Sequence, residues 1–255
     1  MASSDLIAEV EAAGYRCWPA GEIVEYDGWE LRCADGFSGR ANSVLPIGES
    51  SLRLETKLRF CHEWFDQRGV RLEVRCTPLC EPGIDEKLAE MGYSLDRPTH
   101  VMVADLGGGM APGTGVPPET PDDDWWQAMA QLWSIAEERR TGWRGIIERI
   151  ALPATYALVT NGGDGVAAGL GVVDGSWLGL FEIVVALGWR RRGHGREVTR
   201  SLLAWGAAQG ARHAFLQVVA SNAPAIALYE SLGFRHLYDY WYRRAPQETP
   251  ANRPA

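Results

Sequence analysis

The chain has 255 residues, enough for one large domain or two small ones, and its 46% hydrophobic and 23% charged contents are those of an ordinary globular protein. Its 33 acidic residues outnumber its 25 lysines and arginines, which gives a net charge of −8 at pH 7. This acidity argues against a nucleic-acid partner, because such proteins neutralise phosphates with a basic surface. No stretch approaches the roughly 18 apolar residues of a membrane span, so we expect no membrane partner.

The cysteines and the N-terminal residues bear on the compartment and on metals. The sequence has five cysteines and no C-x-x-C pair, and we expect them to be reduced thiols in a cytoplasmic protein. Their spacing fits no common ligand pattern, so no metal is predicted. The first residues carry acids and no long apolar run, unlike a signal peptide. The cysteines are Cys17, Cys33, Cys61, Cys76 and Cys80.

One stretch breaks the composition of the chain. Residues 106–123, "LGGGMAPGTGVPPETPDD", are so rich in glycine and proline that no periodic pattern survives. We predict a linker over residues 107–121, between a first domain at 1–106 and a second at 122–245. The tail at 246–255 is predicted to be disordered.

The second domain mixes helices and strands. A helix is predicted over 122–140, because acids lead the pattern and arginines end it. The pair Asp174-Gly175 predicts a hairpin between two strands within 166–187. The further predicted elements are a strand at 154–160, a helix at 193–210, a strand at 214–220, a helix at 222–233 and a strand at 237–244.

The first half repeats landmarks of the second at an offset of 141 residues. The order of strands and helices also matches, which favours a duplicated domain over coincidence. Under this offset "RRRGHG" at 190–195 faces "ESSLRL" at 49–54, which has no glycine. We therefore expect chemistry in the second copy and its loss in the first. The repeated landmarks are Trp64 and Trp205, Gly69 and Gly210, and Gly92 and Gly233.

A basic loop joins a predicted strand, ending near Leu187, to a predicted helix. Arginines just before a helix are unfavourable by about 0.3–1 kcal/mol each, because the helix dipole is positive there. An anion over the free N–H groups reverses that cost, and Gly193 and Gly195 allow close backbone approach. The loop lacks the third glycine of a dinucleotide fingerprint and the G-K-[ST] of a Walker loop. It therefore predicts either a phosphate site or a solvated basic loop.

Two motifs resemble one known family. Arg190-x-x-Gly193-x-Gly195 after an apolar strand is similar to the acyl-CoA pyrophosphate loop of the GNAT superfamily of N-acetyltransferases. "NAPAIALYESLGF", which holds Asn222 and Tyr229, is similar to that family's N-x-x-A-x-x-L-Y-x-x-x-G-F motif. The resemblance covers roughly residues 122–244. It implies two GNAT-like domains of α/β (α+β) class, each a mixed, mostly antiparallel sheet flanked by helices, with the second one active.

The resemblance also implies roles for single residues. The strand residues Ile183, Val184 and Val185 would splay from the neighbouring strand and bind the pantetheine arm. Asn222 would bind pantetheine or hold the backbone of the active site. Tyr229 would act as the general acid for the leaving thiolate, since a tyrosine (about 10) and a thiol (about 8.5) have similar reference pKa values. The loop residues expected to wrap the pyrophosphate are Arg190, Arg191, Arg192, Gly193, His194, Gly195 and Arg196.

The general base is the least determined role. Glu182 is our first candidate, because it interrupts an apolar strand beside the expected carbonyl site. A carboxylate paired to an arginine, or a water chain in place of Glu182, is the alternative. Some members carry an acid five residues before the motif asparagine, but that position is Gln217, which is not a base. His194 is better explained as a solvated loop histidine.

The acceptor is left open by the sequence. Four tryptophans of the second domain fit either core packing or an aromatic wall for the acceptor. We predict acetyl transfer from acetyl-CoA, as donor and without a metal, directly to a primary amine of a small molecule or peptide. The alternatives are a non-catalytic CoA-binding regulatory module or transfer of a longer acyl group, and a homodimer is left open. The tryptophans are Trp125, Trp126, Trp133 and Trp143.

Overall fold

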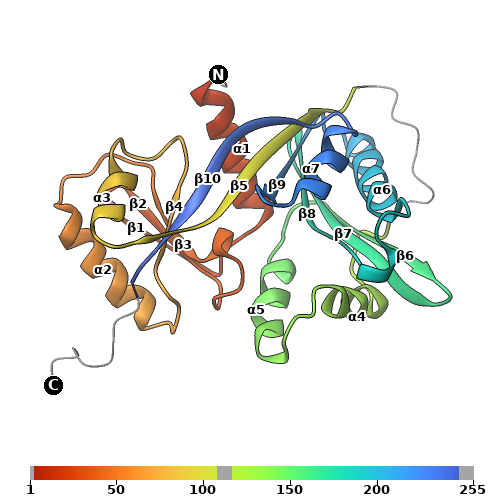
Figure 1. Cartoon of the computed structure of the whole chain (residues 1–255), viewed down its shortest axis with the longest axis horizontal. Coiled ribbons are helices and arrows are strands. Elements are labelled where there is room, and N and C mark those ends of the chain that lie inside the picture. Colours follow the sequence, from red (N-terminus) through yellow and green to blue (C-terminus); the bar gives the residue numbers. More distant parts are fainter. Residues whose placement is uncertain (1–2, 108–116, 247–255) are drawn as a thin grey trace. The chain divides into compact units, whose positions relative to one another are not determined.

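The computed structural model describes residues 3–107 and 117–246 (Figure 1). The chain divides into two compact units. Unit 1 is formed by Met1–Pro19 and Thr99–Tyr238, and unit 2 by Ala20–Pro98 and Asp239–Ala255. None of the described helices has the length and apolar content that a membrane crossing requires. Most of the predicted linker and nearly all of the predicted tail lie outside the described residues.

Unit 1 is a mixed sheet with helices packed on it. Its strands follow the order β5-β9-β8-β7-β6, in which β8 and β9 are parallel and the other neighbours are antiparallel. The strands are β5 (Ser94–Asp105, from Thr99 onward), β6 (Ala154–Asn161), β7 (Asp164–Asp174), β8 (Trp177–Val185), β9 (His213–Val219) and the start of β10 (Arg235–Arg244). The helices are α1 (Ser4–Cys17), α4 (Asp123–Leu132), α5 (Glu137–Glu148), α6 (His194–Ala208) and α7 (Ala223–Glu230).

Alternation along β8 and β9 assigns each residue to one face of this sheet. Leu178, Leu180 and Leu216 belong to the core cluster that includes α6. Phe181 and Phe215, which neighbour Leu180 and Leu216 in sequence, face the other way. Trp18, which caps α1, stacks on Phe181 at a centroid distance of 5.2 Å, and a Cβ on Gly14 of α1 would lie 3.7 Å from Phe215. The two faces therefore carry different layers, α6 and α7 on one and α1 on the other.

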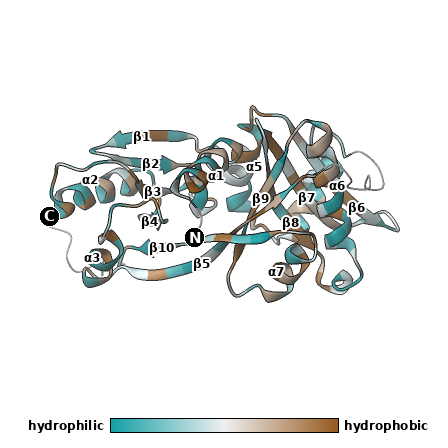
Figure 2. Cartoon of the chain, turned by 90° about the horizontal axis from the view of Figure 1, so that it is seen from above, coloured by the Kyte–Doolittle hydropathy of each residue, from teal (hydrophilic) through white to brown (hydrophobic). Residues whose placement is uncertain are grey.

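Unit 2 repeats this plan on a smaller scale. Its strands follow the order β1-β2-β3-β4-β10, with β3 and β4 parallel and the other neighbours antiparallel. Figure 2 shows both hydrophobic and hydrophilic residues along α2, as expected for a helix with one buried face. The elements are β1 (Glu22–Tyr26), β2 (Trp29–Cys33), β3 (Ser43–Pro46), α2 (Leu54–Asp66), β4 (Glu73–Cys76) and α3 (Ile84–Glu90). The predicted class, a mixed and mostly antiparallel sheet flanked by helices, is confirmed.

The boundaries of the units differ from the predicted domains at 1–106 and 122–245. Helix α1 belongs to unit 1 because its residues pack on β7 and β8, as the Trp18–Phe181 stack shows. Strand β5 pairs with β9 through Thr99–Asp105, and β10 pairs with β4 through Trp241–Arg244. Each unit thus contains a strand from the other half of the sequence.

The predicted helix over 122–140 is interrupted in the structure. Helix α4 ends at Leu132 and α5 begins at Glu137. Between them Ser134 has a φ of +49°, a left-handed conformation that a continuous helix excludes. The break leaves Trp133 at the C-terminal end of α4, where its side chain is 47% exposed.

Candidate active site

The parallel strands β8 and β9 separate before either of them ends. Among the described residues their ladder stops at the pair Leu180–Leu216, although β8 continues to Val185 and β9 to Val219. The other edge of β8 stays paired with β7 as far as Val185. Among the described residues, one edge of Ile183–Val185 therefore has no neighbouring strand, and a ligand bound there stays a prediction.

A bulge in β8 lies at this point of separation. The pairs Ala168–Val184 and Leu170–Phe181 leave both Glu182 and Ile183 opposite Gly169 alone. Glu182 has a φ of +54°, a left-handed conformation that is costly for a residue with a Cβ. The indole of Trp133 donates a hydrogen bond to the Glu182 carbonyl oxygen at 3.3 Å. The tryptophan at the α4–α5 break thus supports the strained bulge.

The basic loop leads into α6 without a capping side chain. A 3-10 turn at Leu187–Trp189 precedes the arginines, and Gly193 occupies the N-cap with a φ of +94°. The first helical bond comes from Glu197 N–H to the Gly193 carbonyl, at 3.0 Å. The N–H groups of the preceding turn have no acceptor within the helix, and the helix dipole adds positive potential there. This end of α6 is therefore suited to an anion.

The side chains of this loop are held by different partners. Arg190 donates to the Val185 carbonyl oxygen at 3.3 Å. Arg192 lies over the Trp189 ring, 4.8 Å from its centroid. Arg196 donates to the Ser231 hydroxyl oxygen at 2.8 Å and so links α6 to α7. Arg191 is exposed, with a φ of +64°.

The histidine of the loop has contacts of its own. His194 Nδ1 lies 3.4 Å from a Glu197 carboxylate oxygen, and its ring lies edge-on to Trp189 at 5.7 Å. It is held beside the first turn of α6 by these two neighbours.

Helix α7 carries the other two predicted residues. The Asn222 side chain caps the helix by accepting from the Ala225 N–H at 3.3 Å. The Tyr229 ring is 7% exposed and belongs to the core cluster against which Ile183 and Val185 pack. The described residues give its hydroxyl no hydrogen-bond partner. Burial raises the pKa of Tyr229 to about 12, so the hydroxyl is protonated at neutral pH.

Three large apolar side chains of unit 1 stay exposed in segments that border the separated strands. Leu187 follows the end of β8 and is 79% exposed, and Val219 at the end of β9 is 42% exposed. The third is Trp133, whose indole is hydrogen-bonded to the Glu182 carbonyl oxygen in the bulge.

The tryptophan alternatives are resolved differently for different residues. Trp125, Trp126 and Trp143 are buried and pack on one another, with ring centroids 5.1–6.2 Å apart. Their packing is that of a core. Trp133 is half-exposed, and the sequence gives no sign that it differs from the other three.

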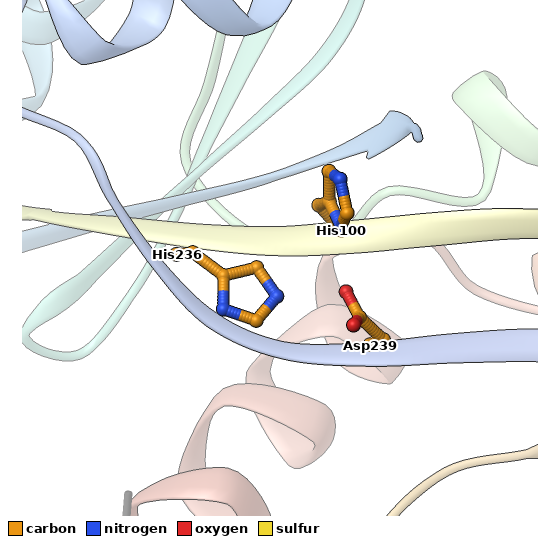
Figure 3. Close-up of side chains that lie close together, drawn as sticks. All are labelled: His100, His236 and Asp239. Atoms are coloured by element: carbon orange, nitrogen blue, oxygen red, sulfur yellow. The ribbon is translucent and has the colours of Figure 1, made fainter. Parts of the chain in front are cut away.

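Three further polar side chains lie elsewhere in unit 1. Gln217 faces α1, since a Cβ on Gly14 would lie 3.6 Å from its side-chain nitrogen. Figure 3 shows His100 on β5 and His236 on β10, whose rings lie edge to face at 5.1 Å. Both imidazoles can serve as metal ligands, so the expectation of no metal stays a prediction.

Comparison with known proteins assigns the chain to a family. The family described as "Probable histone acetyltransferase Rv0428c C-terminal" matches residues 4–243. The chain belongs to this family. It is therefore a GNAT-type N-acetyltransferase, as the two sequence motifs predict.

Individual relatives agree with this assignment. The "Uncharacterized N-acetyltransferase YobR" of Bacillus subtilis is 29% identical over 249 residues, which are 94% of this chain and 98% of the relative. The "Probable histone acetyltransferase Rv0428c" of Mycobacterium tuberculosis is 26% identical over 234 residues, 90% of this chain and 70% of the relative. A GCN5-related N-acetyltransferase from Kribbella flavida has the same fold, with a TM-score of 0.68, 15% identity and 99% coverage of both chains.

Proposed function

We propose that this acetyltransferase moves an acetyl group from acetyl-CoA directly to a primary amine of a small molecule or peptide. The observation that carries the proposal is the opening between β8 and β9, in the same unit as the uncapped start of α6. An extended pantetheine arm would bind the free edge of Ile183–Val185 much as an added strand binds a sheet. The diphosphate would then bind the first N–H groups of α6.

The loop fits a diphosphate in both shape and charge. A Cβ added to Gly193 would meet no heavy atom within 4 Å, so there is room for phosphate oxygens beside the backbone. Arg191 and Arg192 are exposed and supply positive charge. Arg190, through its bond to the Val185 carbonyl, joins the loop to the pantetheine edge. Arg196 and His194 would complete the loop, and Asn222 would fix the start of α7.

The acetyl carbonyl would be polarised by a backbone N–H of β8 at Ile183–Val185. Such a donor is already oriented before the reaction, which is why it stabilises a developing oxyanion effectively. The bulge at Glu182 and Ile183 changes the direction of the strand at this point. Most of the acceleration would come from holding amine and thioester together.

Tyr229 would donate a hydrogen bond to the leaving sulfur. Its pKa of about 12 keeps the proton on the phenol until the thiolate forms. The pKa of a thiol is about 8.5 and that of an unperturbed tyrosine about 10, so burial widens the gap between the pKa values of Tyr229 and the leaving thiol. Burial therefore favours stabilisation of the thiolate by a strong hydrogen bond, with proton transfer completed as the product leaves.

Glu182 is our candidate for removing a proton from the amine, directly or through water. It belongs to the bulge, and its side chain is half-buried. A Glu182→Gln variant that keeps acetyl-CoA affinity but loses turnover, with partial recovery at higher pH, would support this role. Unchanged turnover at every pH would assign proton removal to water.

A peptide amine is the acceptor class that the relatives favour. The matching family and one relative share the description "Probable histone acetyltransferase Rv0428c". A peptide N-terminus or lysine side chain is therefore the first acceptor to test, followed by small amines. The half-exposed Trp133 would provide an apolar surface beside the attacking nitrogen.

The deciding experiment is thiol release from acetyl-CoA with a panel of basic peptides, amino acids and polyamines. Release that depends on one acceptor class supports the proposal and names the class. Measurable CoA binding without release from any acceptor would favour a regulatory CoA-binding module. Propionyl-CoA and longer donors measure acyl length, and intersecting rather than parallel two-substrate kinetics would support direct transfer.

A further inference from the structure

The loop before α2 in unit 2 holds the position that the basic loop holds in unit 1. At the offset of 141 residues, residues 47–53 correspond to 188–194. The backbone N–H groups of this loop are already bonded to a carboxylate. Asp27 accepts from the Ser51 N–H at 3.0 Å and from the Leu52 N–H at 2.9 Å. It also accepts from the Ser51 hydroxyl at 2.6 Å.

The hairpin between β1 and β2 delivers this carboxylate. Asp27 and Gly28 form the turn, with φ values of +45° and +76°. The Gly28 carbonyl oxygen accepts from the Gly48 N–H at 2.7 Å. A Cβ at Gly28 would lie 2.1 Å from the Glu49 carbonyl oxygen, so only glycine fits. The turn is therefore fixed against the loop by contacts besides those of Asp27.

Among the described residues, the corresponding hairpin of unit 1 makes no such contact. Its turn between β6 and β7 contains Gly162 and Gly163, and a Cβ on either would meet nothing within 4 Å. Both glycines are exposed. The start of α6 is thus left without a carboxylate from its own hairpin.

A buried lysine completes the arrangement in unit 2. Lys57 is 1% exposed, and its Nζ donates to the Asp27 carbonyl oxygen at 2.7 Å and to the Ser50 hydroxyl oxygen. Nζ also lies 3.5 Å from an Asp27 carboxylate oxygen and 4.1 Å from the Trp29 ring centroid. Hydrogen bonds from Ser51 and Leu52 hold the pKa of Asp27 well below its usual range. A charge as buried as that of Lys57 needs such a permanent partner.

The strand opening of unit 2 is closed as well. The Pro46 carbonyl oxygen, at the end of β3, accepts from the Glu81 N–H at 3.1 Å. At the offset of 141 residues Glu81 corresponds to Asn222 of unit 1, whereas strand pairing sets Pro46 level with Phe181, because Trp29 pairs with Pro46 and its equivalent Leu170 pairs with Phe181. There the Asn222 N–H bonds instead to the Val219 carbonyl of the preceding strand, at 2.8 Å. The segment before α3 is therefore bonded to the end of β3, whereas the equivalent N–H of unit 1 is bonded within its own segment.

We propose that Asp27 is a built-in anion that fills the phosphate position of unit 2, so that this unit binds no acyl-CoA and the chain takes up one donor molecule. The assignment of that position rests on the proposed function of the α6 loop. The occupancy by Asp27 rests on the contacts within unit 2 alone.

The test removes the internal anion and offers an external one. The Tm of full-length chains carrying Asp27→Ala or Asp27→Asn is measured in inorganic phosphate or sulfate, and again in chloride at equal ionic strength. Asp66→Ala, which removes an exposed carboxylate from α2, is the matched control for net charge. We expect both Asp27 variants to melt lower, and about 50 mM phosphate to raise their Tm by about 3 °C more than it raises that of the parent chain or the control.

An equal phosphate response in all four chains would overturn the proposal. If Asp27→Ala does not fold without salt, Asp27→Asn, which keeps the side-chain size, decides. Calorimetric titration with acetyl-CoA gives a second test. One site per parent chain agrees with the proposal, and two sites overturn it. A chain that binds no acetyl-CoA contradicts the proposed function, while the phosphate series still decides the role of Asp27.

Discussion

The loop before α6 and the loop before α2 solve one physical problem in opposite ways. Both place backbone N–H groups at the start of a helix, where an anion is favourable. Unit 2 supplies the anion from within, through Asp27 and the buried Lys57. Unit 1 supplies arginines and an open glycine instead. If the proposal for Asp27 holds, a duplicated site has lost its ligand because a nearby turn provides a permanent carboxylate in its place.

Glutamate substitutions at equivalent positions of the two loops should give the largest difference in acetyl-CoA affinity. Gly193→Glu places negative charge and a Cβ at the proposed phosphate position, and we expect acetyl-CoA affinity to fall by about 100-fold or more. Its equivalent, Leu52→Glu, should leave affinity unchanged, because Leu52 is an exposed residue of the loop that Asp27 fills. Gly193→Ala separates backbone strain from charge. Isothermal titration gives all three values, and equal losses at positions 52 and 193 would contradict the contrast.

Tyr229 provides the second contrast between the units, because its equivalent in unit 2 is Leu88, which has no hydroxyl group. Tyr229→Phe removes the proposed donor to the leaving sulfur but keeps the buried ring, so we expect kcat to fall about 100-fold. The Kd for acetyl-CoA should stay within about twofold, because the hydroxyl would act on the reacting sulfur and not on the diphosphate. Steady-state kinetics and calorimetry together check this split. A variant that turns over at the parental rate would leave Tyr229 with a packing role only.

Trp133 offers a smaller test, at the bulge of unit 1. Trp133→Phe keeps an aromatic ring but removes the N–H that bonds the Glu182 carbonyl. The loss of one such bond at a strained residue should raise the KM for the amine about fivefold, with acetyl-CoA affinity unchanged. Trp126→Phe is the matched control in the buried cluster. It should lower stability without a selective change in KM.

The last prediction concerns stability at alkaline pH and involves both units. Burial raises the pKa values of Tyr229, Cys17 and Cys61 to about 12. The folded chain then keeps these protons at pH values where the unfolded chain loses them, above about 8.5 for thiols and 10 for tyrosine. The free energy of unfolding should therefore be fully present below about pH 8 and fall as pH rises toward 12. Urea titrations across this pH range measure the free energy of unfolding of the parent chain and of Cys17→Ala in unit 1 and Cys61→Ala in unit 2. Each substitution should make the decrease of this free energy with pH less steep.

Local chemistry made much of the site predictable from sequence. Glycines with positive φ follow α6 and α7 at Gly210 and Gly233, and Asn222 caps α7, because turns and caps depend on a few adjacent residues. The opening between β8 and β9 followed from the family motifs. The class of fold followed from the alternation of patterns.

Features that depend on residues far apart in the sequence could not be predicted from it. Ser134 breaks a convincing helical pattern, and nothing near Trp133 marks it as the tryptophan that reaches β8. Asp27 lies more than twenty positions before the loop that it fills, in a turn that looks ordinary. The unit boundaries escaped for the same reason, because pairing between strands far apart in sequence has no local signature.

The placement of β5 and β10 has a consequence for how the chain is made and cut. Each strand completes the sheet of the unit formed mainly by the other half of the sequence. A fragment that starts after the glycine- and proline-rich stretch would lack β5 and leave β9 with a bare edge, ready to pair with other molecules. The two halves of the sequence should therefore depend on each other for folding, and pairings of such long sequence separation should make folding slow.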